Sequence, residues 1–385
     1  MTSDDSSQKQ TQEHSHKQDF QYSYPLPIYY LTRFFDKING LVKLADKFET
    51  LLLRPKLSEV RIDRPIYITG LARAGTTITL EMLSNHPDVG NHKYIHIPMT
   101  YLPFLWQSFA LKVNVFTERA ERIHQDGIIV NRDSPEALEE VFWQRRFSNV
   151  MDESKSNIMD GLIDDDEFLR FYKTHIKKLL FAQHKTRYLT KNNYNVTRIE
   201  YIKRVIPDAR FLIIVRNPIN HLASTIKQSK LFKKMSKNNE RLEVLTQIIG
   251  HREFGPNRVC INVDNTPTIN YIRELWKNDP NDVEAWAIYW NSIYEYVKNV
   301  LETNEKVASS TLVVNYEDLC DNSEEIIDKI IDHTGLSKRR FRKVKKIYAK
   351  KLRKPKYYKP EFGDEDIQTI KSITGDTASY YGYFN

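Results

Sequence analysis

The sequence predicts a single α/β domain with a central, mostly parallel β-sheet and helices on both faces. Two stretches carry this prediction. In 66–77, a short β-prone run leads through a glycine-rich turn into an apolar-periodic segment that favours a helix. In 210–224, a continuous apolar run leads through Asn217 and Pro218 into a second helix. Such a run is typical of a strand buried on both faces of a parallel sheet.

The turn after the first strand has the spacing of a phosphate-binding P-loop, with four residues between Gly70 and Gly75. Free N–H groups and the helix dipole at a helix N-terminus attract an oxyanion. In nucleoside triphosphatases a lysine follows the second glycine, whereas here the residue is Thr76. The nearby cation is Arg73, whose guanidinium fork suits a smaller oxyanion such as a 5′-phosphosulfate. The alternative is a plain strand-turn-helix with an incidental arginine.

The second strand ends in Arg216, and the helix after it carries Ser224 two turns later. Ligands of open α/β sheets bind outside the carboxyl ends of the strands. We therefore expect Arg216 and Ser224 to converge on one phosphate at that edge of the sheet.

With both motifs in this order, the chain resembles the sulfotransferases that use 3′-phosphoadenosine 5′-phosphosulfate (PAPS), over roughly residues 65–335. Their 5′-phosphosulfate loop has the form Gly-x-x-Arg-Ser-Gly-Thr-Thr, and the similarity is greatest to bacterial-type members. Here Ala74 stands in place of the usual serine. The resemblance implies that the sulfuryl donor is bound by Arg73, Ala74, Gly75, Thr76, Thr77, Arg216 and Ser224.

The resemblance also implies a catalytic lysine. Residues 188–191 are similar to the family strand whose lysine lies near the transferred sulfuryl group, and this lysine is Lys191. In cytosolic members the residue two positions later is the histidine base. Here it is Asn193, which cannot accept a proton at useful pH, so we expect the base to come from elsewhere.

The candidate bases are His96 and His124, with Glu140 as third choice. A histidine accepts a proton near neutral pH, and the loop that carries a catalytic glutamate in several of these families has no carboxylate here. Each candidate has a structural alternative. His124 is also typical of a surface histidine, beside Asp126. The segment 134–143 has a strong helix-start pattern, so the helix dipole also accounts for its acidic residues.

The net charge of the chain limits the kinds of partner that it is expected to bind. The 385 residues carry a net charge of +8, which admits nucleic acid, acidic lipid or an anionic cofactor. No nucleic-acid-binding motif accompanies the charge, which favours the anionic cofactor. No cluster of metal-ligating residues stands out, so we expect no metal.

The domain organisation predicted from the sequence is simple. Residues 1–24 are polar and suggest a disordered tail, and 25–385 form one domain with an insertion at 230–282. Within the insertion, 250–256 combines turn residues with titratable ones, as in a lid or substrate loop. A surface loop without a chemical role is the alternative. There is no signal peptide and no apolar run of about 18 residues, so we expect a cytoplasmic protein.

Two further helical segments have more than one interpretation. The apolar residues of 29–53 recur at helical spacing, and we expect them to make core contacts, with a partner-binding site as the alternative. The segment 338–356 is densely basic, which is compatible with peripheral contact with an anionic surface or with a solvated face of a packed helix. The family resemblance adds a third alternative, in which a lysine or arginine here closes over the cofactor.

These observations together predict sulfuryl transfer from PAPS to a hydroxyl or amine, with release of adenosine 3′,5′-bisphosphate. One rival is a P-loop kinase or NTPase, which the missing loop lysine disfavours. The other is a non-catalytic protein that binds an anionic surface. The acceptor and the oligomeric state are not determined by the sequence.

Overall fold

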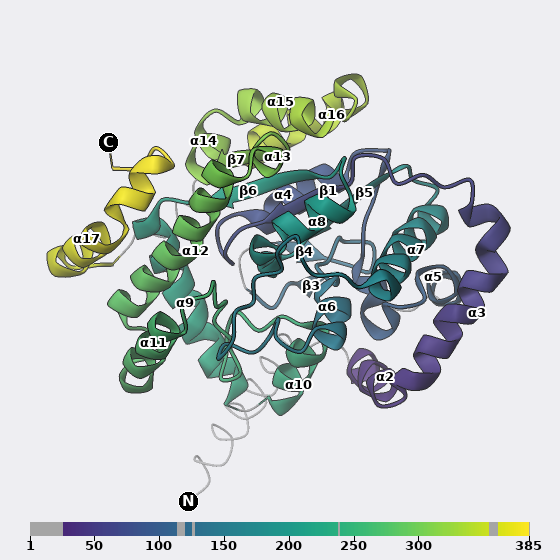
Figure 1. Ribbon diagram of the computed structural model, residues 1–385, viewed down its shortest axis with the longest axis horizontal. Helices are drawn as coiled ribbons and strands as arrows, with labels where there is room; N and C mark the ends of the chain where they lie inside the picture. Colours follow the sequence, from purple (N-terminus) through teal and green to yellow (C-terminus); the bar gives the residue numbers. More distant parts are fainter. Residues whose placement is uncertain (1–25, 114–119, 125–127, 238, 354–360, 385) are drawn as a thin grey trace, which may run out of the picture.

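The computed structural model describes residues 26–113, 120–124, 128–237, 239–353 and 361–384. Its centre is a five-stranded sheet of order β2-β5-β1-β6-β7, in which every neighbouring pair is parallel (Figure 1). The strands are β1 (Ile66–Thr69), β2 (Val89–Gly90), β5 (Arg187–Lys191), β6 (Arg210–Val215) and β7 (Thr311–Asn315). A separate two-stranded sheet pairs β3 (Ala120–Glu121) with β4 (Ile129–Val130). The predicted α/β class with a parallel sheet is confirmed.

Side chains alternate between the two faces of the strands, and each face has its own apolar core. On one face, Tyr67 and Phe211 pack with α7, α8, α9, α12 and α17. On the other, Ile68 and Leu212 pack with α4, α14, α15 and α16. These helices are α4 (Thr76–Ser84), α7 (Asp166–Gln183), α8 (Ile199–Val205), α9 (Pro218–Ser236), α12 (Val283–Thr303), α14 (Tyr316–Asp321), α15 (Ser323–Thr334), α16 (Lys338–Lys351) and α17 (Asp364–Tyr380). Helices thus cover both faces, as in other parallel α/β sheets.

The remaining helices lie around this framework. They are α2 (Leu26–Lys37), α3 (Asn39–Leu57), α5 (Pro103–Lys112), α6 (Glu140–Arg146), α10 (Glu240–Ile249), α11 (Thr266–Asn278), α13 (Glu305–Ala308) and the short 3-10 helices η1 (Tyr94–Met99) and η2 (Asn193–Thr197). No helix in the described ranges combines the length and apolar character needed to cross a membrane.

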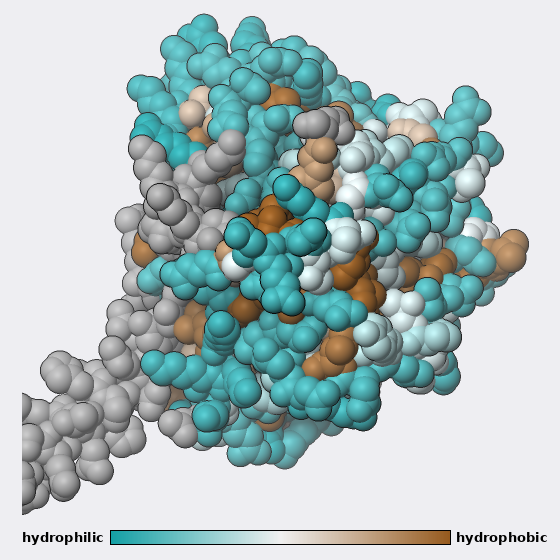
Figure 2. Space-filling model, turned by 90° about the vertical axis from the view of Figure 1, so that its left-hand side faces the viewer, coloured by the Kyte–Doolittle hydropathy of each residue, from teal (hydrophilic) through white to brown (hydrophobic). Residues whose placement is uncertain are grey.

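Only some of the apolar residues of α2 and α3 make the core contacts that were expected of them. The predicted helical spacing is confirmed, but Leu41, Leu44 and Phe48 are each more than 60% exposed. Figure 1 shows α3 along one flank of the molecule, where only its inner side packs on α7. The opposite flank, which carries α17 and is seen in Figure 2, is mostly hydrophilic at its surface. The prediction of core contacts was therefore wrong for the outer half of this apolar set.

The predicted helix start at Ser134 and Pro135 was also wrong, because α6 begins at Glu140. Pro135 instead forms an isolated antiparallel bridge with Lys93, and the Glu136 amide donates to the His92 carbonyl at 2.9 Å. Pairing with another segment holds these residues extended, which overrides the local capping pattern.

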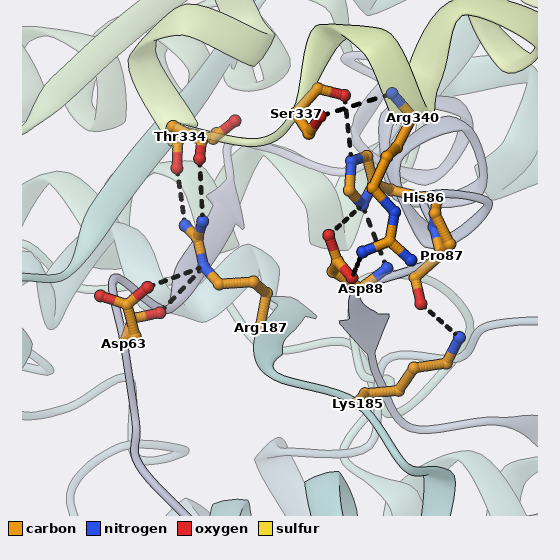
Figure 3. A network of polar contacts seen from close by, with 10 residues as sticks. Asp63, His86, Pro87, Asp88, Lys185, Arg187, Thr334, Ser337 and Arg340 are labelled. Atoms are coloured by element: carbon orange, nitrogen blue, oxygen red, sulfur yellow. Dashed lines mark hydrogen bonds and ion pairs between the residues drawn. The ribbon is translucent and has the colours of Figure 1, made fainter.

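A polar corner fixes α15 and α16 against the amino-terminal end of the sheet (Figure 3). The guanidinium of Arg187, at the start of β5, donates to the carbonyls of Thr334 and Gly335 at 2.6 and 3.1 Å. On the neighbouring turn, His86 contacts the Ser337 carbonyl at 3.3 Å, and Arg340 pairs with Asp88. These contacts set the direction of α16, whose last turn reaches the cavity at the carboxyl ends of the strands.

Candidate active site

The carboxyl ends of the strands open onto a cavity of about 860 Å³. A volume of this order accommodates a ligand the size of a nucleotide. The cavity is lined by the glycine-rich loop, β5, α9, the 250–254 loop and the end of α16, including Arg73, Gly75, Thr76, Thr77, Lys191, Arg216, Ser224, Glu253 and Lys351. Nine lysines and arginines and four carboxylates line it, so its charge suits an anionic ligand.

The loop between β1 and α4 adopts the conformation that an oxyanion site requires. Arg73 and Gly75 both have positive φ, at 74° and 109°, and α4 begins at Thr76. A Cβ on Gly75 would collide with the ring of Tyr316, so only glycine fits this turn. The Thr76 and Thr77 amides lie in the first turn of α4, where N–H groups have no acceptor within the helix. They line the cavity wall and can bind an anion there.

Ala74 differs from its loop neighbours. Its side chain is fully buried in the core beneath the loop, and its amide donates to the Leu71 carbonyl at 3.1 Å. Ala74 is therefore part of the loop structure, and its side chain does not line the cavity.

Side chains from α9 and α12 hold the loop from behind. Trp290 Nε1 donates to His221 Nδ1 at 3.1 Å, which places the imidazole proton on Nε2, where it donates to the Ala72 carbonyl at 2.8 Å. The Tyr294 hydroxyl accepts from the Leu71 amide at 3.2 Å and donates to the Ile214 carbonyl at 3.0 Å. The loop position is thus coupled to the end of β6.

Arg216 and Ser224 lie at the same site as the loop. Arg216 donates to the Arg73 carbonyl at 3.1 Å, and Arg73 Nε donates to Ser224 Oγ at 3.3 Å. The Arg216 guanidinium also lies over the Tyr316 ring at 4.9 Å. Its Nε is buried without a hydrogen bond, and its ion pair with Glu317 is long at 3.9 Å. A buried donor of this kind fits an anion that the cavity would bring.

Lys191 ends β5 and is 9% exposed at the cavity wall. Burial lowers the pKa of its ammonium from the usual range, and the carboxylates of Glu253 and Glu136 oppose that shift. Beside it, Asn193 donates to Glu253 at 2.6 Å, while Thr76 Oγ1 donates to Asn193 Oδ1 at 3.4 Å. A chain of polar contacts therefore links the loop to the Glu253 carboxylate.

Glu253 is a site residue that the sequence analysis did not identify. The sequence places it only in the 250–256 segment, which is compatible with a lid or substrate loop and with a surface loop that has no chemical role. Its loop packs against the site because Gly250 has φ +80°, and a Cβ there would meet Glu140 Cγ at 2.5 Å. His251 holds the same loop through the Ala137 carbonyl at 2.6 Å. The asparagine at position 193, where cytosolic members have the histidine base, was the one sequence signal that the base comes from elsewhere.

The three expected bases lie in different surroundings. His124 lines the cavity, with its ring near those of Phe232 and Phe254 at 5.2 and 6.4 Å. Its expected neighbour Asp126 lies outside the described residues. His96 is fully buried away from the cavity wall, accepts from the Lys93 amide and contacts Gln107 at 3.0 Å.

Glu140, the third choice, is also buried behind the cavity wall. Its carboxylate accepts from Arg198 at 2.6 and 2.8 Å and from Asn192 at 2.7 Å. The contact with Asn192 lies directly beside Lys191 and Asn193. Of the three candidates, only His124 is positioned to contact a ligand in the cavity.

His96 belongs to a buried histidine cluster that makes stability depend on pH. His92 and His175 stack with their Nε2 atoms 3.2 Å apart, and His96 meets His92 edge-on. Burial lowers the pKa of His92 and His175 well below the usual range, and that of His96 to about 4. Below about pH 6.5 the unfolded chain binds protons that the folded protein does not.

We therefore expect the free energy of unfolding to fall by about 1.4 kcal/mol per pH unit for each such histidine as pH drops from 6.5 towards 4.5. Urea unfolding at a series of pH values measures this slope. His175→Leu should reduce it by about one histidine's share, whereas His184→Asn, on the exposed end of α7, should leave it unchanged. A slope that His175→Leu does not alter would show that these buried histidines do not control acid stability.

The end of α16 completes the cavity. Phe341 and Tyr348 pack α16 on the sheet, and the Tyr348 hydroxyl donates to Glu81 at 2.7 Å. Lys351 and Arg353 then reach the cavity wall. No group of three or more potential metal ligands is found within the described ranges.

Comparisons with known proteins identify the family. The family model described as "Sulfotransferase family" matches residues 65–260, which is just over half of the chain. No curated protein matches. A sulfotransferase from Mycobacterium avium has a similar structure, with a TM-score of 0.50, 12% identity, and 86% of this chain and 81% of that chain covered. One from Mycobacterium tuberculosis has a TM-score of 0.48 and 12% identity, with 89% and 85% covered. The matched region contains the loop, Lys191, Arg216, Ser224 and Glu253, and the chain belongs to the sulfotransferase family.

Proposed function

We propose that this sulfotransferase moves a sulfuryl group from PAPS to a hydroxyl or amine and releases adenosine 3′,5′-bisphosphate. The observation that carries the proposal is the convergence of the glycine-rich loop, Arg216, Ser224 and Lys191 on one cation-rich cavity. The donor has two anionic groups, the 5′-phosphosulfate and the 3′-phosphate, and the site has two arginines, Arg73 and Arg216. Arg216 donates to the Arg73 carbonyl, and Arg73 donates to Ser224. The buried, unbonded Nε of Arg216 supports the fit.

Each group has a role in this proposal. Arg73 and the amides of Gly75, Thr76 and Thr77 would hold the 5′-phosphosulfate, with Ala74 shaping the loop. Arg216 and Ser224 would hold the 3′-phosphate. Lys191 would stabilise the negative charge that develops on oxygen as the sulfuryl group is transferred, as preorganised cations do in related transfers.

The acceptor must lose a proton during the transfer, because an oxygen–sulfur bond forms at its hydroxyl while the donor's sulfur–oxygen bond breaks. We assign the proton acceptor to Glu253, whose carboxylate lies at the cavity beside Asn193 and Lys191. Asn193 would orient the carboxylate through its 2.6 Å hydrogen bond. A carboxylate within reach of the acceptor is a suitable general base. His124 is the alternative base on the same wall.

The donor assignment is tested by thermal unfolding with adenosine 3′,5′-bisphosphate and, separately, with ATP and magnesium. A ligand at a hundred times its dissociation constant adds about 2.7 kcal/mol to the stability of the folded state. Arg216→Ala should weaken bisphosphate binding by about tenfold to a hundredfold, because a charged hydrogen bond contributes about 1.5–3 kcal/mol.

Lys343→Ala is the matched control, because this lysine is exposed on α16 and does not line the cavity. It should retain the full shift. A shift with ATP and magnesium but none with the bisphosphate would favour phosphoryl transfer and contradict the PAPS assignment.

A further inference from the structure

The outer side of α2 and α3 presents a continuous row of large apolar side chains to solvent. Its members are each between 54% and 66% exposed: Tyr30, Phe34, Leu41, Leu44, Phe48, Leu51 and Leu52. Along α3 they recur every three or four residues, so they lie along one side of the helix. We refer to these residues as the α2–α3 face. A single exposed apolar residue needs no explanation, but a row of this length indicates a binding surface.

The fully exposed charges on the two helices are all positive. The exposed charged residues of the two helices are Arg33, Lys37, Lys43, Lys47, Arg54 and Lys56. Two of the three acidic residues of the same helices are buried, and the third is partly exposed but paired. Asp46 and Glu49 are buried against Lys178, at 2.5 and 2.9 Å, and Asp36 pairs with Arg145. The α2–α3 face is therefore apolar in the middle and cationic at its margins.

We propose that the α2–α3 face docks on an anionic lipid surface. An amphipathic helix with leucine and phenylalanine on one side and lysine at the margins binds in the plane of such an interface. The apolar residues enter the acyl boundary, and the lysine and arginine stems extend towards the acidic headgroups. This inference does not depend on the reaction proposed above.

Charge argues against a second copy of this chain as the occupant, and composition argues against the segment before α2. A second copy of this chain would bring the cations of one α2–α3 face onto those of the other, and like charges facing each other disfavour association. The one partly exposed acid of these helices, Asp36, is already paired with Arg145 of its own chain. The segment before α2 contains no isoleucine, leucine or valine from residue 1 to residue 24, so it has no branched aliphatic side chains with which to cover the leucines of the α2–α3 face.

The basic helix α16 is the rival surface, because peripheral contact with anionic surfaces was expected through 338–356. It is strongly cationic, but among its described residues Ile347 is the only large apolar side chain that is exposed. Such a helix can attract lipid headgroups electrostatically but has little to insert between acyl chains. Its last turn also lies at the cavity.

Vesicle sedimentation of the full chain tests the proposal. The probes are vesicles of phosphatidylcholine alone and of phosphatidylcholine with phosphatidylglycerol in equal amounts, at low and high salt. We expect the protein to bind only the acidic vesicles, and we expect this binding to weaken as the salt concentration rises. Phe48→Ser/Leu51→Ser and Lys43→Glu/Lys47→Glu should each weaken binding by at least about tenfold.

Lys343→Glu/Lys346→Glu on α16 is the matched control and should bind within about twofold of the wild type, because only charges near the membrane contribute to attraction. A cooperative thermal unfolding transition and a far-ultraviolet circular dichroism spectrum like those of the wild type show that every variant is folded. Two outcomes overturn the proposal. The first is lipid binding that the α16 variant abolishes and the α3 variants leave intact. The second is no vesicle binding, with a dimer in light scattering that Phe48→Ser/Leu51→Ser dissociates.

Discussion

Replacing Glu253 with glutamine is expected to slow sulfuryl transfer by about a hundredfold to ten-thousandfold, the usual contribution of a positioned general base. Stabilisation by adenosine 3′,5′-bisphosphate should not change. Glutamine keeps the length of the side chain and an oxygen that accepts from Asn193, so the 2.6 Å hydrogen bond can persist. The substitution removes the negative charge and, with it, the ability to take up a proton.

The measurement is the release of adenosine 3′,5′-bisphosphate from PAPS with a panel of phenols, aliphatic alcohols and amines. The best acceptor is then used to record the rate as a function of pH. The acidic limb of the wild-type profile, which reports protonation of the base, should disappear in Glu253→Gln.

His124→Gln is the matched comparison, because His124 lies on the same wall of the cavity. We expect it to lower the rate by less than about tenfold if it only shapes the acceptor side. A large loss with His124→Gln and a small one with Glu253→Gln would reassign the base to His124. Losses in both would leave the pH profiles to identify which group titrates.

The sequence was most informative where local pattern and tertiary structure agree. The strands at 66–69 and 210–215 and the helices after them follow from apolar runs, glycines and Asn217-Pro218, and all are present. The start of α6 and the outer face of α3 could not be predicted in this way. The residues after Ser134 have a helix-start pattern, but Pro135 forms a bridge with Lys93 instead. Apolar spacing does not reveal whether another element covers a helix.

The site shows the same division. Arg73, Arg216 and Ser224 were identified because each is tied to a strand end, and the sheet brings strand ends together. Glu253 was not identified, because it lies on a loop 60 residues beyond its partner Asn193. No local pattern encodes such a contact. It exists because Gly250 allows the loop to pack on Glu140 and because His251 reaches the Ala137 carbonyl.

The largest effect on stability is expected for Glu140→Gln. The Glu140–Arg198 ion pair is almost completely buried, with Arg198 over the ring of Trp143 at 4.8 Å. Arginine stays charged in proteins, so removing the carboxylate leaves a buried guanidinium without a counter-charge. Breaking a buried pair in this way costs about 3–5 kcal/mol. Urea unfolding at neutral pH measures the loss.

A second substitution separates the ion pair from other effects of the change. In Glu140→Gln/Arg198→Met no uncompensated charge remains, and glutamine can still accept from Asn192, so we expect most of the stability to return. If the double variant is no more stable than Glu140→Gln, the cost does not come from the unpaired arginine.

The pH–rate profile tests the alternative that Glu140 is the catalytic base. Replacing the catalytic base removes the acidic limb of the profile. Replacing a residue that only holds the 191–193 turn in place changes the rate but leaves the acidic limb. We expect Glu140→Gln to retain that limb, because its carboxylate lies behind the cavity wall and is occupied by Arg198 and Asn192.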